Sequence, residues 1–302
     1  MSLHFVSAEL LILLFVLVSV PVYMLLLVVI IKYRKTEELK SPFFLAVAAL
    51  GVPDLLLTVL TYASNPKLRF PGVLIGTAGH PLQQAVFAMR AVCRNSQALG
   101  ILHITVDRLI VVFKPHTHNL IITTKRTLIA ILIGQLMIPI LPAIPLLIIP
   151  ACQVQPPANR SASDRQGPKT HGFCQKLTIL SSTAIIAVTL LATSVSYAAM
   201  FHKFWKGRNT VSAIEQANHQ RAERNLFITG AVLSLILFVN STITPVGCRP
   251  RGLSAKPAPC MFAMLGSNML LNLINPWLLL ATSSYLRGYF ILFVRCQAHS
   301  DI

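Results

Sequence analysis

The chain has 302 residues, of which 54% are hydrophobic and 12% charged, with 26 Lys and Arg against 9 Asp and Glu. A soluble domain carries about a quarter charged residues because its core needs a solvated shell, so the composition excludes an ordinary soluble enzyme and a disordered protein. The net charge is +17, and the charged residues lie between apolar runs instead of on one polar face. This pattern predicts a polytopic membrane protein with no nucleic-acid partner.

Seven runs are long and apolar enough to cross a hydrocarbon core about 30 Å thick as helices. Five of these runs contain no charged residue, the second contains only Asp54, and the third carries charges near its two ends. The predicted spans are residues 10–31, 43–62, 85–113, 127–149, 177–201, 226–246 and 261–286. No connection has the length of a further domain. We therefore expect residues 1–302 to form one all-α, seven-transmembrane helix bundle.

The basic residues beside the spans predict the orientation of the bundle. More Lys and Arg flank the spans on the side that carries the connections after the first, third and fifth spans. The positive-inside rule then places the N terminus outside and the C terminus in the cytosol, and we expect a location in the plasma membrane. Residues 1–9 contain no Lys or Arg, so they lack the basic region of a cleavable signal peptide.

The second span contains Asp54, the only acid in the central part of any predicted span. A lone carboxylate in hydrocarbon is costly, so Asp54 should face the bundle interior near Asn268, Asn272 and Asn275 of the seventh span. Two interpretations follow. Asp54 is either a proton-linked or sodium-linked switch, or a structural acid that is protonated or hydrogen-bonded.

The outer part of the third span carries Arg90 and Arg94, which share one helix face because they are four residues apart. If they face inward, they form a cationic site for an acidic or polar ligand, with Asn95 and Gln97 as hydrogen-bonding groups. If they face outward, they reach lipid headgroups or pair with Glu9.

The inner end of the third span carries the pair Asp107 and Arg108. Adjacent opposite charges can pair with each other, or the Arg can move to a partner on another helix, which is the physical basis of a two-state latch. Glu223, at the base of the sixth span, is the candidate partner. His103, one turn before Asp107, is interpreted as a buried structural histidine, and Cys93 as a small apolar residue.

Two outer connections each contain a pair of cysteines. Cys152 and Cys174 lie in the connection before the fifth span, and Cys248 and Cys260 lie in the connection before the seventh. Because these loops face an oxidising compartment, we expect two disulfides within the loops, with unpaired or cross-loop cysteines as the alternative. Asn159 begins an Asn-Arg-Ser glycosylation sequon in the first of these loops.

The seventh span contains Pro276 and is followed by a short amphipathic segment, residues 285–296. Its large apolar residues recur at helical spacing, with Arg287 and Arg295 off the stripe, so the segment can lie along the membrane surface. Cys296 at its end is a candidate palmitoylation site, with an unmodified thiol as the alternative. The apolar stripe consists of Leu286, Tyr289, Phe290 and Phe293.

Several short motifs resemble those of rhodopsin-like G-protein-coupled receptors. Asp107-Arg108-Leu109, followed by Pro115, resembles the Asp-Arg-Tyr motif and its following Pro, and Asn275-Pro276 resembles the start of the motif in the seventh helix. Asp54 resembles the acid of the second helix. This resemblance implies that an activation switch involves Asp54, Asp107, Arg108, Asn275 and Pro276, and the contacts expected above add Glu223 and Asn272 to it.

Other stretches are more similar to nematode serpentine chemoreceptors, of class V or class gamma. They are Tyr33–Lys35 leading to Ser41–Phe44, then Lys114–His116, and Ile274–Leu280. The resemblance implies sensing of an external small molecule or peptide and signalling to a cytosolic heterotrimeric G protein. A multi-pass transporter of a small solute is the alternative. The sequence contains no recognisable catalytic motif, and we expect no enzymatic activity, cofactor or metal.

Overall fold

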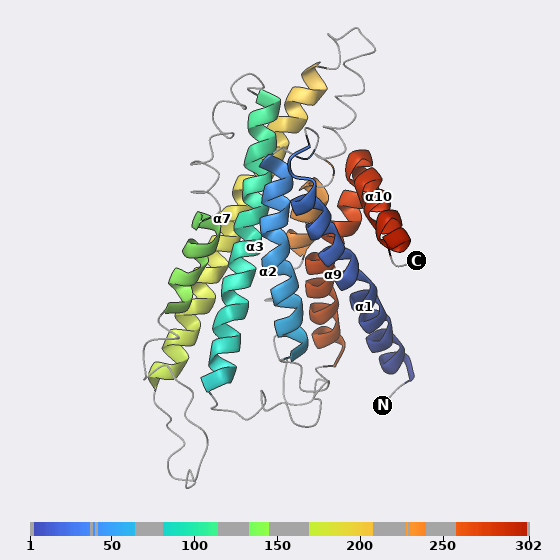
Figure 1. Cartoon of the computed structure of the whole chain (residues 1–302). Coiled ribbons are helices and arrows are strands. Elements are labelled where there is room, and N and C mark those ends of the chain that lie inside the picture. The colour runs from blue at the N-terminus through green and yellow to red at the C-terminus, as the bar shows by residue number, and fades with distance from the viewer. Residues whose placement is uncertain are drawn as a thin grey trace.

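The computed structural model describes residues 3–36, 39, 42–63, 81–113, 133–144, 169–207, 228, 230–239 and 258–300. Within these residues all regular elements are helical (Figure 1). The labelled helices are α1 (Leu3–Lys32), α2 (Pro42–Ala63), α3 (Pro81–Phe113), η2 (Ile138–Ala143), α7 (Lys169–Gly207), α9 (Ala258–Thr282) and α10 (Ser284–Ser300).

Helical segments lie in all seven of the predicted spans. The helices α1, α2, α3 and α7 are each long and apolar enough to cross a membrane, judged over the described residues, and α9 with α10 forms a strongly bent apolar pair. Shorter apolar helices cover Ile133–Ala143 and Gly230–Val239. The prediction of an all-helical membrane bundle is confirmed.

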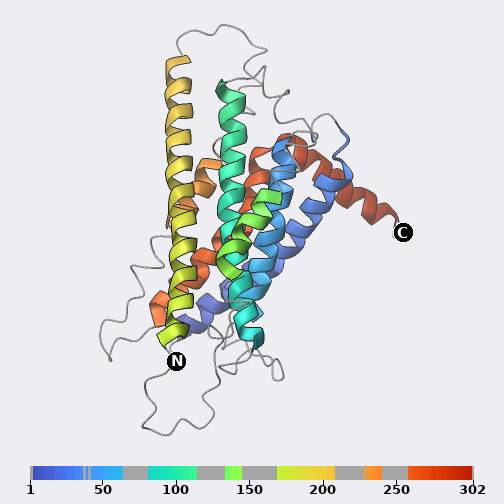
Figure 2. The same cartoon turned by 90° about the vertical axis from the view of Figure 1, so that its left-hand side faces the viewer.

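The central helix of the bundle is α3, which packs against α2, α7 and η2. On the other side α1 packs against α9 as well as α2, so the first and last spans of the chain are neighbours (Figures 1 and 2). The residues of α1 that face α2 and α9, such as Tyr23, Leu26 and Ile30, are almost fully buried. This arrangement surrounds the middle of α3 with other helices.

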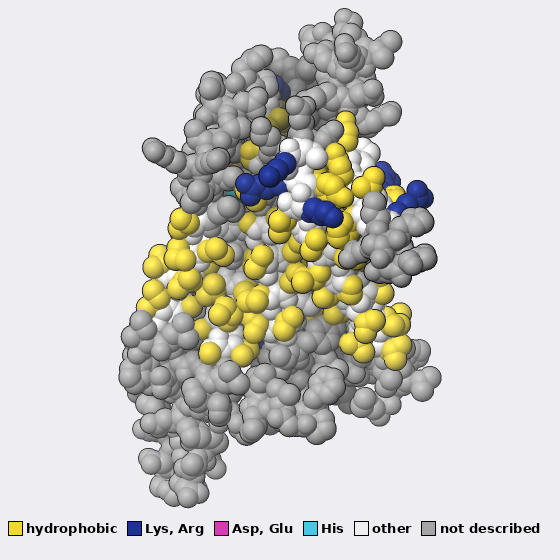
Figure 3. Space-filling view, viewed as in Figure 1, with side chains coloured by type: hydrophobic (Ala, Val, Ile, Leu, Met, Phe, Trp, Pro, Cys, Tyr) yellow, Lys and Arg dark blue, Asp and Glu magenta, His cyan; other side chains and the backbone are white. Residues whose placement is uncertain are grey.

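The outward faces of the helices are apolar. Leu17 of α1 and Leu180 and Leu191 of α7 are about two-thirds exposed. Figure 3 shows a broad band of hydrophobic side chains on one face, with Lys and Arg side chains gathered above it. An exposed apolar band of this kind is typical of a helix bundle that has lipid, and not water, as its solvent.

The fourth span changes from α-helix to the 3₁₀ helix η2 at Ile138. Pro139 and Pro142 lie within this segment. Proline has no backbone N–H to donate and its ring clashes with the preceding turn, so two prolines three residues apart disfavour regular α-helix.

The seventh span ends at Thr282, four residues before its predicted end, because the chain bends by 100° between α9 and α10. The Ser283 hydroxyl oxygen accepts a hydrogen bond from the Leu286 backbone N–H at 3.2 Å and so caps the start of α10. The predicted apolar stripe of this segment faces the bundle: Leu286 and Phe293 are buried, and Tyr289 and Phe290 pack on the core.

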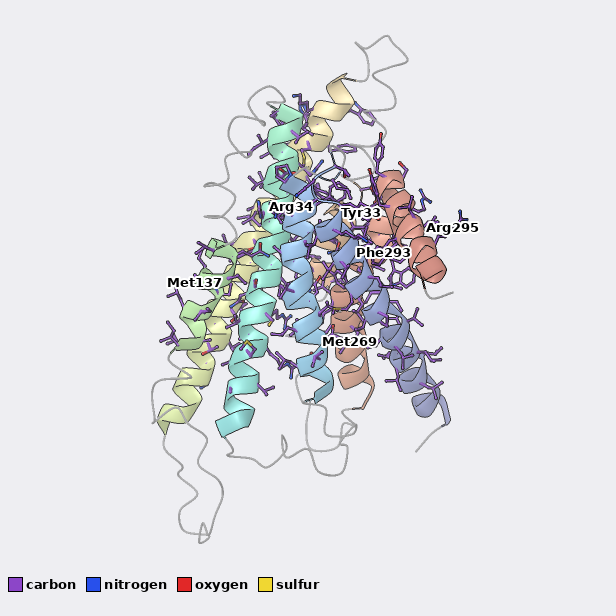
Figure 4. All side chains as sticks on the ribbon, in the orientation of Figure 1. Tyr33, Arg34, Met137, Met269, Phe293 and Arg295 are labelled. Carbon is purple, nitrogen blue, oxygen red and sulfur yellow. The ribbon has the colours of Figure 1, made fainter. Side chains whose placement is uncertain are left out.

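Aromatic and cationic side chains join α10 to the end of α1 (Figure 4). The Lys32 ammonium lies 4.9 Å from the ring centre of Phe293, and the rings of Tyr33 and Tyr289 are 5.0 Å apart. Such cation–π and aromatic contacts each contribute about 0.5–1.5 kcal/mol. The first and the last described helices of the chain are therefore held together at one end of the bundle.

Candidate functional site

The carboxylate of Asp54 lies at the centre of the bundle, where both of its oxygens accept hydrogen bonds. The Tyr23 hydroxyl of α1 donates to Oδ2 at 2.7 Å, and the Gln97 amide of α3 donates to Oδ1 at 2.7 Å. All three side chains are at least 99% buried. A buried carboxylate in a membrane bundle needs such partners, because no water is present in the hydrocarbon to replace them.

Three further side chains extend this network to α9 and along α2. Gln97 also donates to Asn272 Oδ1 at 3.1 Å, Asn272 donates to Thr58 Oγ1 at 3.3 Å, and Asn275 donates to the Tyr23 hydroxyl at 3.0 Å. We call Tyr23, Asp54, Thr58, Gln97, Asn272 and Asn275 the central cluster. It connects four helices, α1, α2, α3 and α9, through side-chain hydrogen bonds.

The sequence predicted part of this cluster. Asp54 faces the interior beside Asn272 and Asn275, as expected. Gln97 was expected near the ligand site but lies in the central cluster. Tyr23 and Thr58 were missed. Thr58 follows Asp54 by one helical turn, which is a usable signal, whereas nothing in the sequence around Tyr23 indicates its partner 31 residues away.

Two amide oxygens in the cluster, Gln97 Oε1 and Asn275 Oδ1, have no hydrogen-bond partner among the described residues. Together with the carboxylate, they form an oxygen-rich set of the type that hard cations bind. The part of the chain that the structure describes contains no group of three or more His, Cys, Asp or Glu side chains. The cluster is thus mainly an uncharged amide and hydroxyl network around one acid.

The hydroxyl of Thr58 is the link between α2 and α9, since it donates to the Asp54 carbonyl at 2.8 Å and accepts from Asn272. Thr58→Val keeps the shape of the side chain but leaves the Asn272 amide without its acceptor. We expect the variant to be less stable by about 1 kcal/mol, measured as the thermal unfolding midpoint of the purified protein in detergent.

The matched control for this variant is Thr193→Val on α7. Thr193 is equally buried, but its hydroxyl donates to Leu190 O within the same helix at 3.0 Å. This substitution should lower the midpoint less than Thr58→Val does. Equal losses for the two variants would show that the link between α2 and α9 adds nothing to stability.

A second polar group lies at the end of α3, about 15 Å along the helix from Gln97. Asp107 and Arg108 are both buried, and Arg108 Nη2 lies 3.0 Å from Asp107 Oδ2. The Arg108 guanidinium also stacks on the ring of Phe43, with 4.2 Å between its Cζ and the ring centre. The predicted pairing of Asp107 with Arg108 is therefore present, and Phe43 of α2 is a partner that the sequence did not indicate. Glu223 lies outside the described residues.

Tyr197 of α7 reaches toward this end of α3. Its hydroxyl lies 3.5 Å from Thr105 Oγ1, one turn before Arg108. On its other side Tyr197 contacts Gly230, where a Cβ atom would overlap the tyrosine hydroxyl and lie 3.2 Å from Cζ. Only glycine fits at position 230 in this arrangement. Tyr197 and Gly230 are thus a point of close contact between the fifth and sixth spans.

The Lys203 ammonium fastens α7 to the last turn of α3. It donates to the Val112 carbonyl and lies 4.8 Å from the ring centre of Phe113. A cation at a helix C terminus binds the free carbonyl groups and the negative end of the helix dipole. This contact fixes the end of α3 that carries Asp107 and Arg108.

At the opposite end of α3, Arg90 and Arg94 lie on the same helix stripe as Gln97 and Ile101, which follow at spacings of three and four residues. Gln97 contacts the central cluster and Ile101 is buried, so this stripe faces the bundle interior. Both arginines are partly buried. Their helix stripe is compatible with the inward orientation, and the predicted ligand site stays a prediction.

Asn95 lies on a neighbouring face of α3, where its amide donates to Ser182 Oγ of α7 at 3.1 Å. The Nε of Arg94 and the Oδ1 of Asn95 are buried atoms without a hydrogen-bond partner among the described residues. Of the residues predicted for ligand binding, Arg90, Arg94 and Asn95 lie together at one level of the bundle.

The predicted modification sites fall largely outside the described residues. Asn159, Cys152 and Cys248 are not described. Cys174, Cys260 and Cys296 lie on the helices α7, α9 and α10, but their side chains are not described. The proposed disulfides, glycosylation and lipidation stay predictions. Cys93 is a buried free cysteine, consistent with its interpretation as a small apolar residue.

One comparison with known proteins identifies a family. The model of the family described as serpentine type 7TM GPCR chemoreceptor Srv matches residues 12–296. The chain matches none of the curated proteins with which it was compared.

Proposed function

The chain belongs to the serpentine type 7TM GPCR chemoreceptor Srv family, and we propose that it binds an external small molecule or peptide and signals to a cytosolic heterotrimeric G protein. As a member of this family it is a multi-pass membrane receptor and not an enzyme. We assign the whole of residues 1–302 to one receptor domain in the plasma membrane. The ligand enters at the end of the bundle near Arg90, and the G protein binds at the end near Arg108.

The distribution of basic side chains supports this orientation. The end of the bundle that carries Arg108 also carries most of the exposed cations of the described residues, from α1, α10, the end of α7 and the residues after α1 (Figure 3), whereas Lys176 lies near the other end of α7. Cationic residues beside transmembrane helices favour the cytosolic side, where they also contact anionic lipids. These side chains are Lys32, Arg34, Lys35, Lys203, Arg287 and Arg295.

The central cluster is the observation that carries the proposal. It lies between the arginines at one end of α3 and the Asp107–Arg108 pair at the other, and it joins four helices by hydrogen bonds. A ligand that moves α3 relative to α9 has to change these bonds. Binding would thereby favour an arrangement in which the inner ends of the third and sixth spans separate, and the G protein would bind that arrangement more tightly.

We assign the remaining roles by the same reasoning. The activation switch within the bundle consists of Asp54, Asn272, Asn275 and Pro276. The switch at its inner end consists of Asp107 and Arg108, with Glu223 as the second partner to which Arg108 can move. Disulfides Cys152–Cys174 and Cys248–Cys260 cover the outer side, which also carries the glycan on Asn159. Cys296 takes a lipid anchor on the inner side, next to the amphipathic α10.

The test of this function is an exchange assay in membranes that contain the receptor and a G protein. A panel of volatile and water-soluble compounds is added, and guanine-nucleotide exchange is measured. We expect a subset of compounds to increase exchange at least fivefold, because coupling energies of about 1–3 kcal/mol change affinities about 5- to 150-fold. Membranes without the receptor are the control.

The same preparation distinguishes a receptor from a transporter. Sealed vesicles are loaded or diluted with the active compounds, and their accumulation is measured over time. A receptor produces exchange without accumulation. Receptor-dependent accumulation of a compound without nucleotide exchange would contradict the proposed function and favour solute transport.

A further inference from the structure

We propose that the junction between the inner end of α1 and the helix α10 binds a multiply charged anionic phospholipid, with Lys32 as its central contact. We call Lys32, Tyr33, Tyr289 and Phe293 the α1–α10 seam. The inference goes beyond the proposed function, because it assigns a lipid partner and a place where the lipid binds. It rests on the proposed function only for the orientation that makes this leaflet the cytosolic one.

The ammonium of Lys32 lies between two helices. Lys32 is the last residue of α1, and its ammonium is 4.9 Å from the ring centre of Phe293 on α10 and 5.8 Å from that of Tyr33. The Phe293 side chain is buried, but Lys32 is exposed. An aromatic ring attracts a cation, whereas a long Lys side chain is otherwise flexible. The rings therefore hold the ammonium at one place, where its N–H groups can donate to a headgroup phosphate.

Further exposed cations lie at the same end of the bundle. Figure 3 shows Lys and Arg side chains along one edge of the apolar band, and Figure 4 places Tyr33, Arg34, Phe293 and Arg295 at that end. About four to eight Lys or Arg beside a transmembrane helix or on an amphipathic helix are typical of binding sites for anionic lipids. The described cations here are Lys32, Arg34 and Lys35 at the end of α1, and Arg287 and Arg295 on α10.

The charge of this surface is positive. Among the described side chains the acids are Asp54 and Asp107, and both are buried inside the bundle. Glu37, Glu38 and Asp301 lie outside the described residues and follow α1 and α10 in the sequence. These three acids are fewer than the five exposed cations, so an excess of positive charge remains even if all three lie beside them. The surface is therefore complementary to an anionic headgroup.

An exposed apolar track on α1 leads to Lys32. Leu17, Met24 and Val28 precede Lys32 at spacings that place them on one helix face, and they are between 46% and 66% exposed. In a bilayer, acyl chains cover such a track. A phospholipid can thus contact the track with its chains and the ammonium with its headgroup. A free phosphate would use the ammonium alone, so the two features together favour a lipid.

The cations belong to two different helices, which favours a headgroup with several negative charges. Lys32 extends from α1, whereas Arg287 and Arg295 extend from α10. A phosphorylated inositol headgroup has enough charges to pair with cations of both helices, and a singly charged headgroup does not. Binding would therefore add to the aromatic contact between Tyr33 and Tyr289 that holds α10 on α1.

Short-chain lipids added to the purified receptor in a non-ionic detergent test the inference without an external ligand or a G protein. The probes are dioctanoyl phosphatidylinositol bisphosphate, dioctanoyl phosphatidylserine, dioctanoyl phosphatidylcholine and inositol trisphosphate, which has phosphates but no acyl chains. We expect the bisphosphate lipid to raise the thermal unfolding midpoint in a saturable way, with the other three probes weaker by about tenfold or more. An equal effect of any of these three, or no saturable effect of the bisphosphate lipid, would overturn the proposal.

Variants at position 32 identify the central contact. Lys32→Gln removes the charge and should weaken binding of the bisphosphate lipid about fivefold, the effect expected for one cation beside an anionic headgroup. Lys32→Arg keeps the charge and should bind nearly as well as the native receptor. The matched control is Lys176→Gln, an exposed lysine near the other end of α7. Equal affinities of Lys32→Gln and Lys176→Gln would overturn the assignment.

Phe293→Leu distinguishes a positioned ammonium from general attraction to a charged surface. The variant keeps every charge but removes the ring beside the Lys32 ammonium, so it should weaken lipid binding by about two- to threefold. If Phe293→Leu does not fold, Tyr33→Leu removes the second ring and replaces it. Unchanged affinity in the variant measured would show general attraction only, and would overturn the seam as the site.

The double variant Glu37→Gln with Glu38→Gln tests whether these acids occupy the cations. If they do, only the double variant would bind the bisphosphate lipid, and this result would overturn the proposal for the native receptor. Failure of this inference is separable from failure of the receptor function. Nucleotide exchange without lipid binding would refute only the lipid site, and lipid binding without exchange would refute only the signalling.

Discussion

Replacement of Arg108 by Ala is expected to abolish ligand-driven nucleotide exchange, measured per receptor at the cell surface. Arg108 is held by Asp107 at 3.0 Å and by stacking on Phe43 at 4.2 Å. In the proposed switch, the Arg108 guanidinium leaves these partners when the inner ends of the helices separate. The Ala variant has no guanidinium, so it lacks the contact that distinguishes the resting arrangement from the separated one. A difference of about 2.7 kcal/mol between the arrangements would correspond to a hundredfold change in exchange.

Three companion variants make the Arg108 prediction specific. Phe43→Leu removes the stacking contact but keeps the charge pair, so it should raise exchange in the absence of ligand by a few-fold. Arg108→Lys keeps a positive charge and is the substitute measurement if loss of the buried pair lowers the surface amount of the Ala variant. Arg287→Ala on α10 is the exposed control. A normal dose response in Arg108→Ala would contradict the assignment of Arg108 to the switch.

Gly230→Ala is expected to destabilise the receptor by about 1–3 kcal/mol, the usual effect of an added group in a filled space. The new Cβ would overlap the Tyr197 hydroxyl, and an aromatic side chain packed between two helices has few other positions to adopt. The measurement is the thermal unfolding midpoint in detergent. The midpoint of Gly230→Ala should fall by several degrees relative to the native receptor.

The double variant Gly230→Ala with Tyr197→Phe should recover most of this loss. Without the hydroxyl, the nearest ring atom is Cζ at 3.2 Å, a distance that a small shift of the ring can relieve. Gly288→Ala is the matched control, because no atom lies within 4 Å of a Cβ at that position. A midpoint for Gly230→Ala as high as that for Gly288→Ala would show that the close approach of Tyr197 and Gly230 does not limit packing.

The sequence predicts the elements of this protein well because each helix must satisfy the bilayer by itself. The lengths of the apolar runs alone located the spans. The apolar residues from Leu286 to Phe293 recur at helical spacing in the sequence, and this stripe packs against the bundle. The end of the seventh span was not visible. The apolar run continues through Ser283, and after the bend of 100° α10 contacts α1, which lies far away in the chain.

The sequence predicted the candidate site only where a charged residue stands in an apolar run. An isolated acid in an apolar run drew attention to Asp54, and two arginines four residues apart drew attention to the outer end of α3. The partners of these residues are ordinary side chains. Tyr23, Phe43 and Tyr197 gain their roles from helix packing across long sequence separations, and spacing along one helix contains no information about such pairs.

The packing of α1 against α9 and α10 has a consequence for biogenesis. Translation makes α1 first and α10 last, so three partners of α1 reach the membrane only when synthesis is almost finished. They are Asn275, which donates to the Tyr23 hydroxyl, Trp277, whose indole N–H donates to Ser19 Oγ at 2.9 Å, and Tyr289, whose ring lies 5.0 Å from that of Tyr33. Until then α1 lacks these three contacts, and its nearly uniform apolar surface suits the lipid during that interval. Premature termination before residue 275 would leave this first helix without any of the three contacts, and termination between residues 277 and 289 would remove only the contact with Tyr289.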